Sequence, residues 1–303
     1  MRRIFASFLL IFSLHGASLN GAIAADKLVV EKLDADSYPA EIIVDPRELS
    51  ENGLPDGRIS TIKGDIVAAW YSRPTERYRH GILGDKIEAG SLKVKTHFGA
   101  TLTYRLPRSE VFEDITPRLV DLDRNGKIEV VTIRSSVSKG AAITVYGLNG
   151  PLLVQKATTP FIGLSHRWLN IAGISNFSLG KTLEIAAVIT PHIGGTLRFY
   201  KYNRGKLLQR AAASGFSNHV IGSREQRLSV VLDFDGNGTP DIALPSADRL
   251  SLYIMSLTEN GMVLLAEAQL PSPINKAITL RGEGNSVQFI VGLEDESVYS
   301  VHR

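Results

Sequence analysis

Short apolar runs recur along this chain, and each begins next to an acidic or amide residue. These anchor residues are Asp65, Glu129, Glu184, Asp241 and, more faintly, Gln288. Strand-forming residues dominate the runs, turn residues bound them, and they are too short for helices, so the pattern predicts β-strands. The anchors are spaced by roughly 60 residues, the size of a unit of about four strands, such as a propeller blade.

The interior of the unit repeats as well. A strand carrying a tyrosine follows each of four anchors, at residues 143–146, 197–200, 250–253 and 297–299. A glycine turn and a third strand come next, at residues 149–154, 203–208 and 260–265. Glycine supplies the positive φ that tight hairpins need. The chain is therefore predicted to be all-β, with no helical period of any length.

The two ends of the chain complement each other. The last repeat stops after its second strand at Val301, whereas residues 27–33 and 40–45 read as two spare strands. Pairing Val298–Val301 beside Leu28–Leu33 completes the last blade and removes an open sheet edge. We predict a single β-propeller domain over residues 25–303, with five four-stranded blades. A six-bladed ring, in which the N-terminal strands form a blade of their own, is the alternative.

Two nine-residue loops place oxygen-bearing side chains at positions 1, 3, 5 and 9, with glycine at position 6. The side chains and the position 7 carbonyls come from Asp121, Asp123, Asn125, Lys127 and Glu129, and from Asp233, Asp235, Asn237, Thr239 and Asp241. Lys127 and Thr239 occupy position 7, which supplies a backbone carbonyl. A hard cation takes six to eight such oxygens, so the loops predict two Ca²⁺ ions.

These loops are not EF-hands, because the twelfth position holds Thr132 in one and Leu244 in the other, and a strand follows instead of a helix. Extracellular calcium modules bind with affinities at which they are normally saturated. We therefore expect the ions to hold the blade turns closed, the alternative being calcium-regulated binding.

The first 24 residues have the pattern of an export signal. Arg2 and Arg3 precede an apolar stretch over residues 4–14, and Ala22 and Ala24 supply a small-residue cleavage signal. Residues 1–24 read as a signal peptide and predict a periplasmic or secreted protein; a membrane anchor is disfavoured because the apolar stretch is short. No later segment is long and apolar enough to span a membrane.

Charge and cysteine content limit the partners. The sequence has 34 Lys plus Arg, 31 Asp plus Glu and no cysteine. Two of the arginines lie in the predicted signal peptide, so the remaining chain is close to neutral. No basic run with interleaved aromatics is present, which argues against nucleic acid as a partner. We expect a monomer without disulfides, in which bound calcium supplies stability.

The loop motif Asp-x-Asp-x-Asn-Gly-x-x-Asp/Glu, which leads into an apolar strand in repeated β units, resembles the FG-GAP and VCBS repeat proteins. That group includes the calcium-binding propeller of integrin α subunits. The likeness covers most of the chain after residue 24 and implies a β-propeller with bound calcium. Two of the five repeats carry complete loops, and residues 173–180 of the third have lost every loop carboxylate before Glu184. The Phe-Gly and Gly-Ala-Pro signatures are not recognisable, so the resemblance does not imply a partner.

Basic residues precede several of the predicted innermost strands. They are Arg118, His166, Arg167, His219, Arg224 and Arg227. In a propeller such segments can border the mouth of the central channel, where convergent cations would suit carboxylate, uronate or phosphate groups. The alternative is that they are ordinary exposed or strand-capping residues.

An aromatic and basic insertion over residues 70–84 lengthens the first repeat. It predicts either a recognition loop for a sugar or a protein or packing over the first blade.

Sequence motifs of catalysis are missing: there is no Gly-x-Ser-x-Gly elbow, His-Glu-x-x-His, phosphate loop or cysteine nucleophile. We therefore expect a non-enzymatic binding or scaffold module with a protein or carbohydrate ligand. The alternative is a hydrolase or lyase that acts on an anionic carbohydrate or phosphate at the channel mouth.

Overall fold

The computed structural model describes residues 25–39 and 52–303. Within these residues the chain is all-β, arranged in four sheets, none of which closes into a barrel. Two short 3-10 helices, η1 (Ala35–Ser37) and η3 (Gly284–Ser286), are described as well. No helix in the described ranges is long and apolar enough to cross a membrane.

We name five strand groups in chain order. Groups 1 and 2 share a nine-stranded sheet, because β7 (Glu110–Phe112) pairs with β5 (Glu88–Thr96) on one side and with β9 (Glu129–Ser136) on the other. Group 1 contains β3 (Ser60–Thr61), β4 (Ile66–Thr75), β5 (Glu88–Thr96) and β6 (Thr101–Arg105). Group 2 contains β8 (Arg118–Val120), β9 (Glu129–Ser136), β10 (Gly140–Asn149) and β11 (Leu152–Thr158).

The other three sheets hold one group each. Group 3 contains β12 (Leu169–Ser175), β13 (Glu184–Ile189), β14 (Thr196–Asn203) and β15 (Lys206–Ser214). Group 4 contains β16 (Val230–Leu232), β17 (Asp241–Pro245), β18 (Ser251–Thr258) and β19 (Gly261–Gln269). Group 5 contains β20 (Thr279–Arg281), β21 (Gln288–Gly292), β22 (Val298–His302) and the N-terminal strand β2 (Val29–Leu33).

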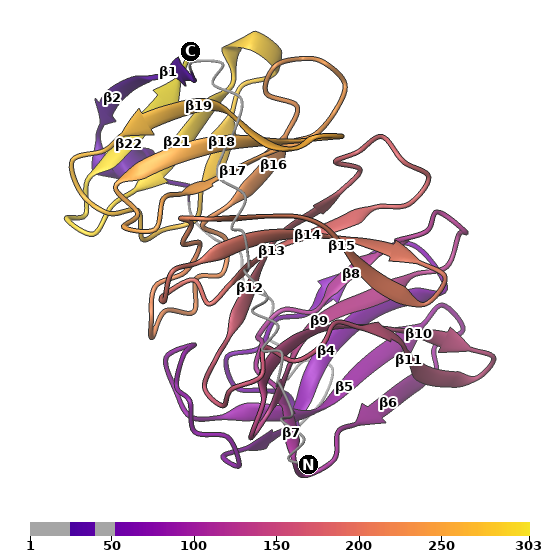
Figure 1. Ribbon diagram of the computed structural model, residues 1–303. Coiled ribbons are helices and arrows are strands. Elements are labelled where there is room, and N and C mark those ends of the chain that lie inside the picture. The colour runs from indigo at the N-terminus through magenta and orange to yellow at the C-terminus, as the bar shows by residue number, and fades with distance from the viewer. Residues whose placement is uncertain (1–24, 40–51) are drawn as a thin grey trace, which may run out of the picture.

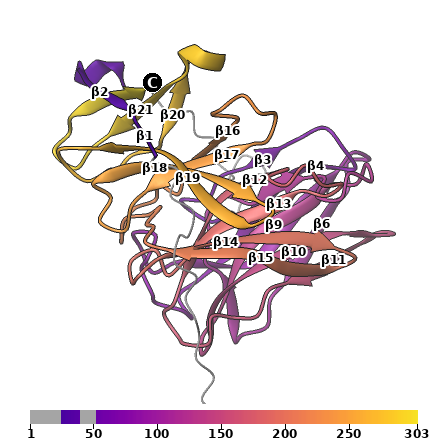
Figure 2. The same cartoon turned by 45° about the horizontal axis from the view of Figure 1, so that its top comes forward.

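The predicted strands are confirmed. The apolar runs beside the anchors form β4, β9, β13, β17 and β21, and the tyrosine strands form or overlap β10, β14, β18 and β22. Successive groups lie side by side in chain order, from the purple strands of group 1 to the yellow strands of group 5 (Figure 1). Figure 2 shows β12 and β13 of group 3 between group 2 and group 4.

Three apolar cores connect neighbouring groups. One joins groups 1, 2 and 3, a second joins groups 3 and 4, and a third joins groups 4 and 5. Gly173 shows how closely these sheets approach: a Cβ there would lie 2.4 Å from Cγ2 of Val231 on β16. Only a residue without a side chain fits at that contact.

The two ends of the chain meet in group 5. Strand β2 pairs antiparallel with β22, from Val29 opposite His302 to Leu33 opposite Val298, which confirms the predicted pairing. A second contact was not predicted: β1 (Asp26–Lys27) pairs in parallel with β19 of group 4. The other predicted N-terminal strand, residues 40–45, lies outside the described residues.

The segment between β15 and β16, residues 215–229, contacts every strand group, and we call it the crossing segment. Gly222 donates its N–H to the carbonyl of Ile82 in group 1, and Ser217 donates to Pro245 in group 4. The Gln226 side chain donates to Asp114, which precedes group 2. Further bonds reach Gly195 of group 3 and Ile278 beside group 5. A segment expected to border a channel therefore ties the groups together.

Candidate functional site

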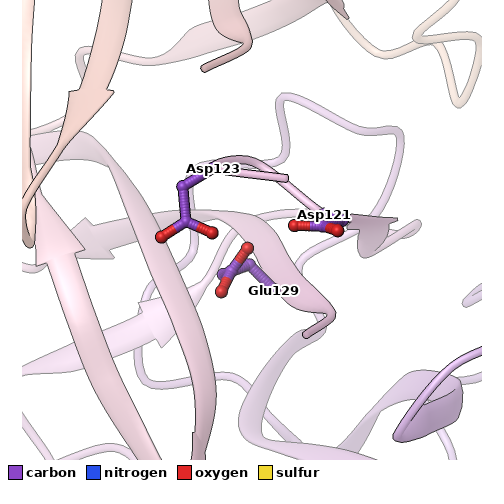
Figure 3. Close-up of side chains that lie close together, drawn as sticks. All are labelled: Asp121, Asp123 and Glu129. Atoms are coloured by element: carbon purple, nitrogen blue, oxygen red, sulfur yellow. The ribbon is translucent and has the colours of Figure 1, made fainter. Parts of the chain in front are cut away.

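The first acidic loop connects β8 to β9 and gathers three carboxylates. Oxygens of Asp121, Asp123 and Glu129 lie within 4.8 Å of one another (Figure 3). Asp121 accepts the backbone N–H of Asn125 at 2.9 Å and of Gly126 at 2.8 Å, so the turn holds this side chain in place. Glu129 accepts the N–H of Leu122 at 3.0 Å. The turn thus points three acids toward one centre.

The second acidic loop, between β16 and β17, repeats this arrangement. Oxygens of Asp233, Asp235 and Asp241 also lie within 4.8 Å of one another. Asp233 accepts the N–H of Gly238 at 2.8 Å, and Asp241 accepts the N–H of Phe234 at 3.0 Å. Two loops far apart in the chain therefore share the hydrogen bonds from the position 6 N–H to the first acid and from the position 2 N–H to the last.

The predicted loop ligands other than the acids form the turn itself. Asn125 and Asn237 accept the N–H groups of Lys127 and Thr239 through their amide oxygens, at 2.8 and 2.7 Å. The ammonium group of Lys127 points to Asp65 of group 1 at 4.0 Å. These contacts fix the backbone at position 7 of each loop, where a carbonyl ligand was predicted.

The electrostatics of both loops fit a cation. Burial raises the pKa of Glu129 to about 7, and the charges of Asp123 and Asp121 act in the same direction. Burial also raises the pKa of Asp241. The Oδ1 atoms of Asp123 and Asp241 are buried without a hydrogen-bond partner in the described part of the protein. A buried carboxylate oxygen without a partner is costly, and a hard cation would satisfy it.

A different cluster lies where the insertion of the first repeat meets the linker after β7. His80 Nδ1 lies 2.5 Å from Oε1 of Glu113, whose side chain is fully buried. Ser135 donates its hydroxyl to the other oxygen of Glu113, and the Trp168 indole donates to the Glu113 backbone carbonyl at 3.0 Å. The carboxylate is thus fixed on both sides, and it in turn orients the imidazole.

Two aromatic rings surround this pair. Tyr78 stacks on His166 with ring centroids 5.1 Å apart, and His80 meets His166 edge-on at 5.0 Å. The hydroxyl of Tyr78 accepts the backbone N–H of His166 at 2.8 Å. His166 is exposed and has a φ of 55°, a left-handed conformation that is uncommon for residues other than glycine. Such strained residues cluster at functional sites.

Burial also changes the pKa values of the acids in this cluster. It raises the pKa of Glu113, and it raises the pKa of nearby Glu88 well above its usual range, with the charge of Glu113 adding to the effect. Burial raises the pKa of Tyr78 to about 12, so its hydroxyl keeps its proton at neutral pH. Several titratable groups with shifted pKa values beside an exposed histidine indicate a candidate active site.

The six predicted basic residues do not form one face. His166 and Arg167 lie at the His80–Glu113 cluster, whereas Arg118 and Arg227 line a separate cavity. His219 is buried and contacts His192, with 3.0 Å between Nδ1 of one ring and Nε2 of the other. Arg224 pairs with Asp56 at 3.0 Å and with Asp85 at 2.8 Å. These last two residues belong to the crossing segment and are held by internal contacts.

Part of the insertion of residues 70–84 packs against the rest of the fold, which was one of the two alternatives considered for it. Tyr78, Ile82 and Leu83 are buried and pack against other groups, while His80 reaches the cluster. Sequence reasoning missed Glu113 because no local motif surrounds it. The presence of His80 inside a long insertion was the one signal that could have suggested this position.

No family model matches the chain, and no curated protein does. Among solved structures, the chain resembles the crystal structure of a protein from Bacteroides fragilis NCTC 9343 described as a "putative 6-phosphogluconolactonase", with a TM-score of 0.42 and 14% identity. The match covers 80% of this chain, which spans 64% of the length of that protein.

This comparison contradicts our prediction of a non-enzymatic binding or scaffold module, because the similar protein is described as an enzyme. That prediction is therefore withdrawn. At this identity and TM-score the likeness itself carries no activity and no site residue over to this chain.

Proposed function

We propose that this protein is a hydrolase or lyase for an anionic substrate, with His80 as its general base. The observation that carries the proposal is the contact between His80 and the buried carboxylate of Glu113. A carboxylate accepts the proton of Nδ1, which leaves the lone pair on Nε2. The His80 side chain is 15% exposed, so part of the ring is open to a bound molecule.

The arrangement follows the logic of a base oriented by a third group. Glu113 holds the imidazole in one tautomer and stabilises the imidazolium that forms when His80 takes a proton. Ser135 is fully buried and donates to Glu113, so it serves to position that carboxylate and not as a nucleophile. His80 would therefore deprotonate water in a hydrolase or a substrate carbon in a lyase.

The substrate-facing side is formed by His166 and Arg167. The guanidinium of Arg167 contacts the carbonyl of His166 at 3.2 Å, and Arg167 makes no ion pair with any described residue. A guanidinium next to the exposed ring of His166 suits a carboxylate or phosphate group.

Product analysis tests this function. The protein is incubated with polyuronates, sugar phosphates, sugar lactones and their neutral counterparts, and products are followed by NMR. We expect turnover of an anionic compound, and His80→Gln to lower it by about 100-fold or more. Glu113→Gln should lower turnover as well, whereas the control His97→Gln, at an exposed histidine outside the cluster, should not. Full activity in His80→Gln would overturn the assignment.

We propose further that the five strand groups are the blades of a five-bladed β-propeller. The support is the repeated order of strands in each group, the pairing of β2 with β22, and the cores between consecutive groups.

The two acidic loops are proposed to hold Ca²⁺, bound by Asp121, Asp123 and Glu129 in one loop and by Asp233, Asp235 and Asp241 in the other. Their role is to hold the turns that connect an innermost strand to the next. This assignment agrees with the resemblance to FG-GAP and VCBS repeats and with the export predicted for residues 1–24.

A further inference from the structure

A cavity of about 420 Å³ lies between the edges of β8 and β12 and the end of the crossing segment. Its lining includes three arginines, Arg58, Arg118 and Arg227, and no carboxylate. Strands β8 and β12 are the first strands of groups 2 and 3, and residues of both line the cavity. Its volume falls within the range of small-molecule sites.

The arginines are held in defined positions. Arg118 Nη1 donates to the buried Asp114 at 2.5 Å, which uses one of its five N–H donors. Arg227 forms a two-pronged pair with Glu225, at 2.8 Å from Nε and 2.7 Å from Nη2. Because these guanidinium groups are ordered before any ligand arrives, less side-chain entropy is lost on binding.

One lining residue shows what else the ligand must offer. Gln226 is 7% exposed and donates its Nε2 to Asp114 at 3.1 Å. Since a carboxylate only accepts, this contact fixes the orientation of the amide and leaves Oε1 on its other side. Oε1 is buried and has no hydrogen-bond partner among the described residues. A buried acceptor of this kind calls for a donor, such as a hydroxyl group.

We propose that this cavity binds a small anion that carries hydroxyl groups, such as a sugar acid or a sugar phosphate. The arginines contact the anionic group, a hydroxyl donates to Oε1 of Gln226, and Leu119 and Ile171 contact the carbon skeleton. The site uses none of the residues of the His80–Glu113 cluster, so it does not depend on the proposed catalytic function.

Calorimetry with defined probes tests the site. Glucuronate and glucose 6-phosphate represent the two sources of anionic charge, glucose supplies hydroxyls without charge, and acetate and inorganic phosphate supply charge without hydroxyls. We expect one or both sugar anions to bind at least tenfold more tightly than the three controls. Arg227→Gln should weaken binding by about tenfold or more, because a hydrogen bond to a charged group is lost.

Three variants test whether the sugar anion binds at this cavity. Arg118→Lys keeps the charge beside Asp114 while removing the planar fork, and should weaken binding without unfolding the protein. Arg210→Gln, at an exposed arginine on β15, is the matched control and should bind normally. His80→Gln should also bind normally. Failure of both sugar anions to bind, equal binding of glucose, or unchanged binding by Arg227→Gln would each overturn the proposal.

Discussion

The loops between the first and second strands of groups 2, 3 and 4 surround a buried acid in two different ways. All three lead into a strand whose first residue is a buried acid: Glu129, Asp241 or Glu184. In groups 2 and 4 that acid faces two further carboxylates. In group 3 the Ser178 hydroxyl donates to Glu184 instead. The buried acid is thus the common element of the three turns, and the two further carboxylates are an addition to it in groups 2 and 4.

Removal of calcium should have the largest effect on this comparison. With the affinity range of extracellular modules, two occupied loops stabilise the fold by several kcal/mol, which corresponds to about 10 °C in Tm. We expect the Tm to fall by that amount when chelator replaces about 10 mM calcium, measured by differential scanning calorimetry. Identical melting in both conditions would contradict a cation in either loop.

Variants that remove a ligand from one loop should each lose about half of the calcium-dependent stabilisation. Asp123→Ala removes a ligand from one loop and Asp235→Ala from the other, so calorimetric titration should show one calcium ion in each variant and two in the native protein. The calcium-dependent rise in Tm should fall by about half in each. Ser178→Ala, in the loop without the acid cluster, is the control and should retain both ions. Unchanged stoichiometry in both Asp variants would remove the basis of the assignment.

Group 3 should instead respond to pH. Burial lowers the pKa of His192 to about 4 and of His219 to about 3, and the charge of His192 adds to the shift of His219. A histidine whose pKa is lower in the folded state contributes stability above its unfolded value, near 6.5, and loses it as the pH falls toward the folded value. The Tm of the native protein should therefore drop between about pH 6.5 and pH 4.

The double variant His192→Gln, His219→Gln isolates this contribution from that of the carboxyl groups. Its Tm should change less than the native Tm over the same pH range, with and without calcium. A parallel decline of both proteins would show that the two histidines are not the source.

The smallest effect is expected from loss of the hydrogen bond that Ser178 donates to Glu184 in group 3. Ser178→Ala leaves the carboxylate of Glu184 without this donor, which should destabilise the protein by about 1 to 3 kcal/mol. The loss should be the same with calcium or with chelator, as measured by urea unfolding. A loss that disappears on calcium addition would place a third ion in this loop.

The strands and the acidic loops were predictable because both are local patterns. An apolar run beside Glu129 or Asp241 and oxygens at alternate loop positions occupy fewer than ten or so consecutive residues. The His80–Glu113 contact joins residues 33 positions apart, and His192–His219 joins residues 27 positions apart. Nothing in either neighbourhood marks the partner.

The crossing segment explains why the candidate basic residues lie in different surroundings. Arg224 and Arg227 are three positions apart, yet one pairs with Asp56 and Asp85 and the other lines a cavity with Arg118. Residues 215–229 have no regular strand, so no periodicity indicates which side chains point inward. Their directions depend on contacts with all five groups, which exist only in the folded protein.

The pairing of β2 with β22 has a consequence for the order of events during synthesis. Strand β2 leaves the ribosome early, but its partner, Val298–His302, is made some 270 residues later. At typical elongation rates β2 remains without its partner strand for tens of seconds. The last sheet therefore closes after translation of residue 302, and a nascent chain stalled within group 5 should remain sensitive to proteases at its N-terminal end.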